Sequence, residues 1–138
     1  MMSRFHHLGH LFTLHQQSRF LISGGLATTS HWLSMTLLVL FGASALSSTI
    51  VGSTVGAFCN YWLQKHYTFE SHSTDSESIP KYIASSAVAW CMNFLFFLLL
   101  QAIADLGVAF TQALTSLLVA FFNYHIYKRF VFHVSSQS

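Results

Sequence analysis

Apolar residues fill four long stretches of the sequence, and polar residues are confined to the segments between and beside them. The stretches run over residues 20–41, 45–63, 82–103 and 108–127. An α-helix needs about 20 mostly apolar residues to cross the hydrocarbon layer of a membrane. The pattern therefore predicts an all-α integral membrane protein with four transmembrane helices.

Three polar segments remain outside these stretches. They are an N-terminal arm (1–18), a loop between the second and third helices (70–80) and a tail (133–138). The arm places Phe5, Leu8 and Phe12 on one side of a helix, which favours a helix lying in the membrane interface. The loop is rich in Ser, Asp and Glu, as expected of a solvated linker.

The composition supports a membrane protein, because 53% of the 138 residues are hydrophobic and only 7% are charged. An ordinary soluble domain carries about 25% charged residues, so too few are present to cover a water-exposed surface. No segment outside the helices is long enough for a catalytic domain. We expect no cofactor and no metal: the two Cys residues lack a zinc-binding spacing, and His6 and His10 in the arm lack acidic or thiol ligands.

The positive charges all lie on one side of the predicted helices. They precede the first helix, lie between the second and third, or follow the fourth, at Arg4, Arg19, Lys65, Lys81, Lys128 and Arg129. By the positive-inside rule, both termini and the loop face the cytoplasm. Such a basic rim suits anionic lipid headgroups. Six spread cations form no track for nucleic acid, so no nucleic acid is expected as a partner.

The two halves of the sequence repeat each other. Residues 19–23 align with 81–85, and residues 60–69 (NYWLQKHYTF) align with 123–132 (NYHIYKRFVF). Each half contains two predicted helices, so both halves enter the membrane in the same direction. The sequence therefore predicts two parallel-repeat helical hairpins, with repeat 1 at 19–69 and repeat 2 at 81–132.

The repeat also pairs polar residues at membrane depth. His31 aligns with Asn93, and two helix faces align: Thr49, Ser53, Ala57 and Asn60 with Gln112, Ser116, Ala120 and Asn123. At His31, Asn93, Asn60 and Asn123, polar groups at this depth favour a binding site, and helix packing is the alternative. Packing is favoured at the small residues Ser48, Gly52, Gly56, Ser53, Ser116, Ala57 and Ala120, which let another helix approach closely. Assembly of copies of the chain through the face of Ser48, Gly52 and Gly56 is a further expectation.

Together these residues resemble the GtrA-like family of small four-span bacterial membrane proteins. The resemblance rests on residues 19–25, Thr28 with a polar residue at 31, and the doubled motif, and it covers residues 19 to 132. It implies participation in cell-surface polysaccharide synthesis or glycosylation. The expected role is that of a flippase, which moves a polyprenyl-phosphate-linked sugar across the bacterial inner (plasma) membrane.

The side chains suit such a substrate, because hydroxyl groups of a sugar need hydrogen bonds in an apolar medium and a phosphate needs cations. We assign sugar binding in a polar groove to His31, Asn93, Asn60, Asn123, Thr28, Thr49, Ser53, Gln112 and Ser116. We assign phosphate binding to Lys65, Lys128, Arg129, Arg19 and Lys81. The expected partners are this glycolipid, membrane lipids, a membrane glycosyltransferase and further copies of the chain.

Two other functions remain open. A small multidrug-type transporter also has four short spans but relies on a glutamate in its first span, which is absent here. A non-transporting scaffold for a glycosyltransferase would need the protein but not its polar groove. An enzyme is disfavoured, because no nucleophile–base pair accompanies a carboxylate. Without a nucleotide-binding loop or a carboxylate inside a span, we expect a passive facilitator, and His31 is the candidate for proton coupling.

Overall fold

The protein, seen in a computed structural model, is all-helical over the residues that the structure describes. These are residues 2–104 and 107–132, with side chains described from Leu14 onward except at 109. The helices are α1 (Met2–Leu40), α2 (Ala45–Leu63), α3 (Asp75–Ile103) and α4 (Val108–Ile126), and two π-helical turns follow, η1 (Gln64–Thr68) and η2 (Tyr127–Val131). No strand occurs in this part of the chain, so the predicted all-α class is confirmed.

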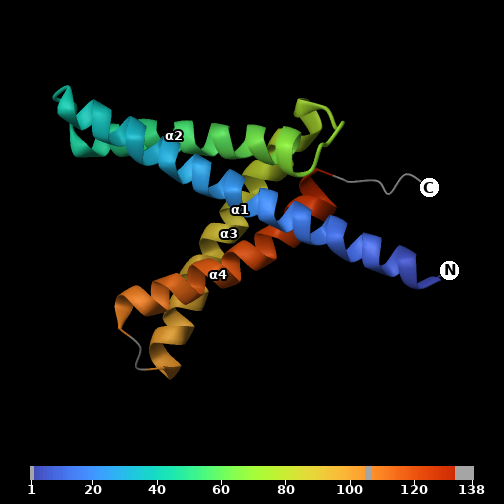
Figure 1. The fold of residues 1–138 in the computed structure, drawn as a ribbon. Helices are drawn as coiled ribbons and strands as arrows, with labels where there is room; N and C mark the ends of the chain where they lie inside the picture. The colour runs from blue at the N-terminus through green and yellow to red at the C-terminus, as the bar shows by residue number, and fades with distance from the viewer. Residues whose placement is uncertain (1, 105–106, 133–138) are drawn as a thin grey trace. The chain divides into compact units, whose positions relative to one another are not determined.

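The chain forms two compact units, Met1–Ser71 and His72–Ser138, called unit 1 and unit 2 below. In unit 1, α1 packs along α2, and in unit 2, α3 packs along α4 (Figure 1). Each unit is thus a helical hairpin. Helix α4 and turn η2 begin and end 63 residues after α2 and η1. For example, α2 begins at residue 45 and α4 at 108, and η1 begins at 64 and η2 at 127.

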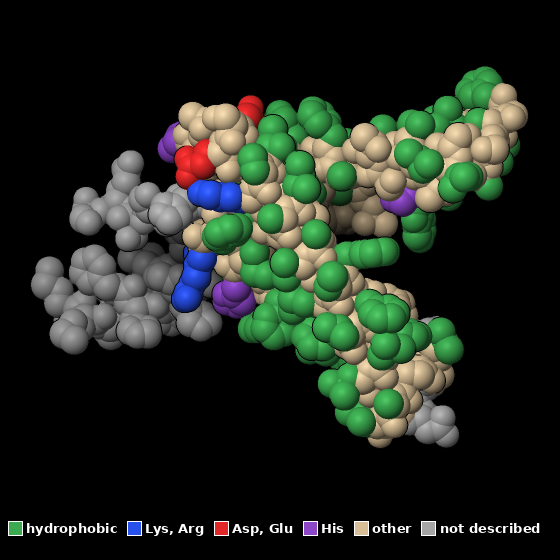
Figure 2. All heavy atoms as spheres, turned by 180° about the vertical axis from the view of Figure 1, so that it is seen from behind, with side chains coloured by type: hydrophobic (Ala, Val, Ile, Leu, Met, Phe, Trp, Pro, Cys, Tyr) green, Lys and Arg blue, Asp and Glu red, His purple; other side chains and the backbone are tan. Residues whose placement is uncertain are grey.

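The described helices differ in whether their length and apolar composition suffice to cross a membrane. One helix, Asp75–Ile103, is long and apolar enough to cross a membrane by length and composition. All four helices nevertheless carry large exposed apolar side chains, such as Trp32, Phe58, Trp90 and Leu117, with exposed fractions between 64% and 82%. Figure 2 shows apolar side chains spread over the helical arms, whereas the Lys and Arg side chains in view lie away from the tips of these arms.

Helix α1 is longer than predicted. It runs unbroken for 39 residues from Met2 to Leu40, so the arm is not a separate interfacial helix but the first half of α1. Ser18, at the expected boundary, bonds the Leu14 carbonyl within the same helix at 3.0 Å. Proline is absent before position 80, so nothing interrupts the backbone hydrogen bonds. The side chains of Arg4, His6 and His10 lie outside the described residues.

A glycine ends α1 and sets the turn into α2. Gly42 has a φ of 87°, which is the left-handed conformation that glycine adopts without steric cost. Its N–H donates to the Val39 carbonyl, and the Ala43 N–H donates to the Leu38 carbonyl, both at 3.0 Å. These two bonds form the Schellman motif, which satisfies the last carbonyl groups of a helix.

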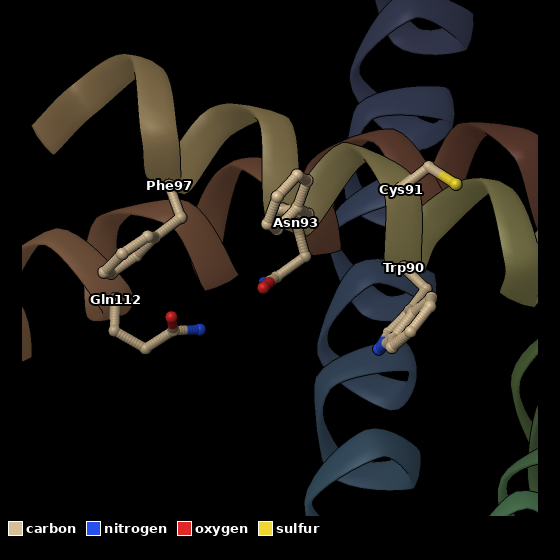
Figure 3. A pocket seen from close by; sticks show the side chains of 6 residues that line it. Trp90, Cys91, Asn93, Phe97 and Gln112 are labelled. Carbon is tan, nitrogen blue, oxygen red and sulfur yellow. The ribbon is translucent and has the colours of Figure 1, made fainter. Parts of the chain in front are cut away.

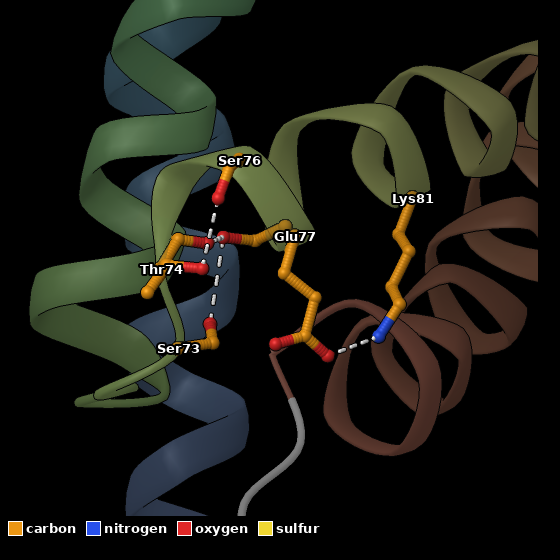
Figure 4. A network of polar contacts seen from close by, with 6 residues as sticks. Ser73, Thr74, Ser76, Glu77 and Lys81 are labelled. Carbon is orange, nitrogen blue, oxygen red and sulfur yellow. Dashed lines mark hydrogen bonds and ion pairs between the residues drawn. The ribbon is translucent and has the colours of Figure 1, made fainter.

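Helix α3 also begins earlier than predicted, so the expected linker at 70–80 is helical from Asp75 onward. The Thr74 carbonyl accepts the N–H of Glu77 at 3.2 Å. Carboxylates at Asp75 and Glu77 lie in the first turn, where the helix dipole favours negative charge. Lys81 pairs with Glu77 one turn away at 2.7 Å (Figure 4), which also supports an early helix start.

Two glycines bring α1 and α2 into close contact. A Cβ atom placed on Gly52 would lie 2.8 Å from the His31 carbonyl oxygen, and one on Gly56 would lie 2.8 Å from the His31 Cβ. Ser48, Gly52 and Gly56 are all buried. This face therefore packs helices within unit 1, and it is not available for the assembly of copies that the sequence predicted there.

Unit 2 differs at the same level. Thr111, Thr115 and Val119 stand 63 residues after Ser48, Gly52 and Gly56. Thr111 and Thr115 are fully buried. In unit 1, His31 of α1 packs against the bare glycine backbone of α2. The β-branched side chains of α4 prevent α3 from packing against the backbone of α4 in the same way.

Candidate functional site

Cations lie over aromatic rings at the end of the unit 1 hairpin. The Arg19 guanidinium carbon lies 5.0 Å from the centre of the Tyr67 ring, and Lys65 Nζ lies 5.9 Å from the centre of the Tyr61 ring. Arg19 also donates to the Tyr67 carbonyl at 3.1 Å and forms an ion pair with Glu70. We call Arg19, Tyr61, Lys65 and Tyr67 cluster 1.

The same arrangement recurs in unit 2. Lys81 Nζ lies 5.9 Å from the centre of the Phe130 ring, and Lys128 Nζ lies 5.6 Å from the centre of the Tyr124 ring. We call these four residues cluster 2, and Arg129 follows Lys128 in the same π-helical turn. Cation–aromatic contacts within about 6 Å are attractive and orient the cation.

Each contact of cluster 2 is the repeat of one in cluster 1. In each unit, the cation just before the apolar stretch of the first helix, Arg19 or Lys81, lies over an aromatic residue of the π-helical turn. The Lys of that turn lies over the Tyr four residues before it. The sequence predicted these cations as phosphate ligands but did not predict their contacts with the rings. The spacing of four between Tyr61 and Lys65, and between Tyr124 and Lys128, was the available signal, because such residues are neighbours on a helix.

Buried polar contacts hold the π-helical turn of unit 1 in place. The Ser23 and Thr68 hydroxyl oxygens are 2.9 Å apart and join α1 to η1. The Gln64 amide donates to the Phe20 carbonyl and to the Asn60 side-chain oxygen, each at 3.3 Å. Asn60, a predicted sugar ligand, therefore supports Gln64 in this unit.

In unit 2, contacts between aromatic rings hold the π-helical turn in place. Tyr127 stands where Gln64 does in unit 1, and its ring lies 5.5 Å from the Tyr82 ring and 5.8 Å from the Phe132 ring. The π-helical turn closes as in unit 1, because the Phe132 N–H donates to the Tyr127 carbonyl at 2.9 Å. The buried side-chain oxygen of Asn123, another predicted sugar ligand, has no hydrogen-bond partner within the described residues.

The predicted phosphate ligands differ in how accessible they are. Lys65 is buried, with 5% of its surface exposed. Lys128 is half-buried and Arg129 is exposed. The side chains of Arg19 and Lys81 are 27% and 29% exposed, and each has a carboxylate partner. Cluster 2 with Arg129 therefore offers an incoming anion the more accessible cations.

A pocket of about 470 Å³ lies between α3 and α4. Its lining residues are Trp90, Cys91, Asn93, Phe94, Phe97 and Gln112. The side-chain amides of Asn93 and Gln112 extend into the same space (Figure 3). Gln112 also donates to the Ser116 hydroxyl at 3.3 Å. Unit 2 thus brings together three of the predicted sugar ligands, Asn93, Gln112 and Ser116.

The predicted sugar ligands of unit 1 are placed differently. The hydroxyl groups of Thr28, Thr49 and Ser53 donate to carbonyls of their own helices at 2.8 to 3.0 Å. A helix-internal hydrogen bond accounts for each of them. His31 is half-buried and contacts the glycines of α2. Of these four side chains, His31 thus packs between helices, whereas the three hydroxyl groups are exposed and already bonded within their own helices.

A metal site is not formed by the described side chains, among which no group of three or more His, Cys, Asp or Glu could hold an ion. Cys59 and Cys91 are both free.

Comparison with known proteins identifies a family for the chain. The family model described as GtrA/DPMS, transmembrane domain, matches residues 19–132. This range covers most of the chain and contains both cation–aromatic clusters and the pocket. No curated protein and no solved structure matches the chain.

Proposed function

The chain belongs to the GtrA/DPMS transmembrane-domain family, and from this membership we propose that it moves a polyprenyl-phosphate-linked sugar across the bacterial inner membrane. Membership makes it a membrane protein and indicates involvement in lipid-linked sugar processes. The family is generally non-enzymatic, and we propose no reaction for this chain. The sugar would serve cell-surface polysaccharide synthesis or glycosylation.

The duplicated cation–aromatic cluster carries this proposal. A glycolipid of this kind has an anionic phosphate where its apolar tail meets its polar head. Each hairpin has cations and aromatic rings at one end of long apolar helices. Aromatic rings favour the headgroup level of a membrane, and a Lys or Arg near an anionic surface contributes about 1 kcal/mol to binding. The clusters therefore match the part of the substrate that most needs a protein partner.

We propose that all four helices span the membrane, with the clusters and both termini at the cytoplasmic face. Helices α2 and α4 have 19 residues each, which at 1.5 Å per residue matches a hydrocarbon core of about 30 Å. The hydroxyl groups of Thr49 and Ser53 donate to carbonyls within α2, which reduces the free-energy cost of placing them in lipid. Transport in this proposal is passive, driven by consumption of the sugar lipid outside.

The experiment that tests the phosphate role replaces Lys65 and Lys128 together by Gln in protein reconstituted into liposomes. The measured quantities are binding and translocation of a polyprenyl-phosphate-linked hexose. If each lysine contributes about 1 kcal/mol, binding weakens roughly 30-fold. The matched control, Lys65→Arg with Lys128→Arg, keeps both charges and is expected to retain most activity. Unchanged binding in the Gln variant would remove the phosphate role.

A second candidate function is a scaffold that binds and positions a membrane glycosyltransferase. The observation that favours it is the state of unit 1, where hydroxyl groups are satisfied inside their helices and His31 contacts α2. A scaffold needs the fold but not the polar side chains. Cells that lack the protein would then lose the sugar product, whereas cells with charge-neutral cluster variants would keep it. Self-assembly, if it contributes, must use a face other than Ser48, Gly52 and Gly56.

A further inference from the structure

We propose that the pocket between α3 and α4 binds the sugar head of the lipid-linked substrate, and that unit 2 alone provides this site. The inference rests on the proposed function, because it assumes a glycolipid substrate. It adds a second binding station, distinct from the phosphate-binding clusters.

The lining of the pocket has the chemistry that a sugar requires. Trp90, Phe94 and Phe97 supply aromatic rings, and Asn93 and Gln112 supply amides. A sugar ring has an apolar C–H face that packs on aromatic rings, and its hydroxyl groups both donate and accept hydrogen bonds. An amide side chain also does both. The pocket volume of about 470 Å³ lies within the range of about 300–1,000 Å³ typical of small-molecule sites.

The state of Asn93 argues for a polar occupant over a hydrocarbon tail. No hydrogen bond joins its side chain to another group among the described residues. A polar group that stays unbonded in an apolar medium raises the free energy of the protein, because it has lost its hydrogen bonds to water. A sugar hydroxyl in the pocket would remove this cost, whereas a hydrocarbon chain would not.

Unit 1 has no equivalent of this arrangement at the matching positions. His31 stands 62 residues before Asn93 and packs against Gly52 and Gly56. Thr49 stands 63 residues before Gln112, and its hydroxyl donates to the carbonyl of Ala45 at 2.8 Å. In unit 2, Thr115 and Val119 stand at the positions of the two glycines, and Thr115 is fully buried. The two halves of the repeat have therefore diverged, with close packing in one and a pocket in the other.

The pocket lies too far from cluster 2 for one headgroup to reach both. Gln112 and Lys128 are 16 residues apart along α4 and η2, which at about 1.5 Å per residue is roughly 24 Å. The sugar is bonded directly to the phosphate, so its ring cannot enter the pocket while the phosphate contacts Lys128. The pocket therefore acts as a later station, after the phosphate has left the cations.

Cys91 and Trp90 line the pocket and report its occupancy directly. The test uses purified full-length protein with Cys59→Ser, Trp32→Phe and Trp62→Phe, so that only Cys91 and Trp90 give a signal. The probes are a polyprenyl-phosphate-linked hexose and the same polyprenyl phosphate without sugar. The measurements are the rate of Cys91 alkylation by a small maleimide and the emission of Trp90.

We expect the hexose-linked lipid to slow alkylation at least fivefold and to shift Trp90 emission, and the sugar-free lipid to do neither. Asn93→Leu and Gln112→Leu should each abolish most of this protection, because each removes hydrogen bonds to the sugar. Thr49→Val, the matched change in unit 1, should leave it intact. Equal effects of both lipids would mean that the tail fills the pocket, and no effect on either signal would mean that it stays empty. Either result would overturn the inference.

Failure of the inference can be told apart from failure of the proposed function. Asn93→Leu should remove most of the Cys91 protection but keep binding of the sugar-free polyprenyl phosphate, because the two stations are separate. If both lipids bind the wild-type protein but the hexose-linked lipid does not protect Cys91, the pocket assignment alone is wrong. If neither lipid binds the wild-type protein, the proposed function itself is wrong.

Discussion

The contact between α1 and α2 at Gly52 and Gly56 gives the sharpest structural prediction. Replacing either glycine by alanine adds one methyl group to a helix that accepts alanine well, so the effect comes from packing alone. On Gly52, the new carbon would lie 2.8 Å from the His31 carbonyl oxygen and 3.1 Å from the Met35 Cβ. On Gly56, it would lie 2.8 Å from the His31 Cβ and 3.1 Å from the Ala27 carbonyl oxygen.

The size of the effect follows from these distances. Carbon atoms in ordinary contact are about 3.5–4.0 Å apart, so α1 must move away by about 0.7 Å or more. The atoms in the way are backbone oxygens and Cβ atoms, which cannot rotate aside. A gap of about 0.5–1 Å removes a quarter to a half of the dispersion energy of each neighbouring contact, and overpacking typically lowers the free energy of unfolding by about 1–3 kcal/mol. We expect a loss in that range for Gly52→Ala and for Gly56→Ala.

The assay is thermal unfolding in detergent, followed by circular dichroism. Gly24→Ala and Gly25→Ala are matched controls, because a Cβ at either position meets no atom within 4 Å. Alanine is a better helix former than glycine by about 0.8–1.0 kcal/mol, so these controls should unfold at the same or a higher Tm. If Gly52→Ala unfolds at the Tm of Gly24→Ala, the close contact at His31 is wrong.

Three further predictions concern single contacts. Glu70→Gln removes the carboxylate partner of Arg19 and should tighten binding of polyprenyl phosphate several-fold in liposome co-sedimentation; weaker binding would contradict this. Ser23→Ala leaves the buried Thr68 hydroxyl unpaired and should lower the free energy of unfolding by about 1–3 kcal/mol, whereas Ser23→Ala with Thr68→Val should recover part of it; no recovery would mean that the pair is not hydrogen-bonded. His31→Asn should leave translocation intact and independent of a proton gradient, and a gradient dependence lost in this variant would establish proton coupling.

Helix positions were predictable where the apolar pattern had clear ends. The predicted helix at 45–63 coincides with α2, and the one at 108–127 matches α4 to within a residue. The errors fell on polar segments. Residues 2–18 were given to the arm and residues 75–80 to the linker, but they form the first part of α1 and the start of α3. Polarity decides whether a residue meets lipid, whereas local backbone bonding decides whether it is helical.

The sequence predicted which cations belong to the candidate site, but it did not predict which aromatic rings they contact. The repeated motif pointed to Lys65 and Lys128 as phosphate ligands, yet their contacts with Tyr61 and Tyr124 emerged only from the structure. Periodicity places residues on a helix face, but the neighbouring helix decides what that face touches.

Residue type and spacing are enough to predict that the chain is helical, rich in apolar residues and built from two similar halves. The difference between the halves depends on how the helices pack, which the residue pattern does not give. Alignment pairs His31 with Asn93, yet one packs against glycines and the other faces a pocket. The reason is that packing depends on the volume of the residues across the helix interface: Gly52 and Gly56 admit His31, whereas Thr115 and Val119 carry side chains at the matching positions.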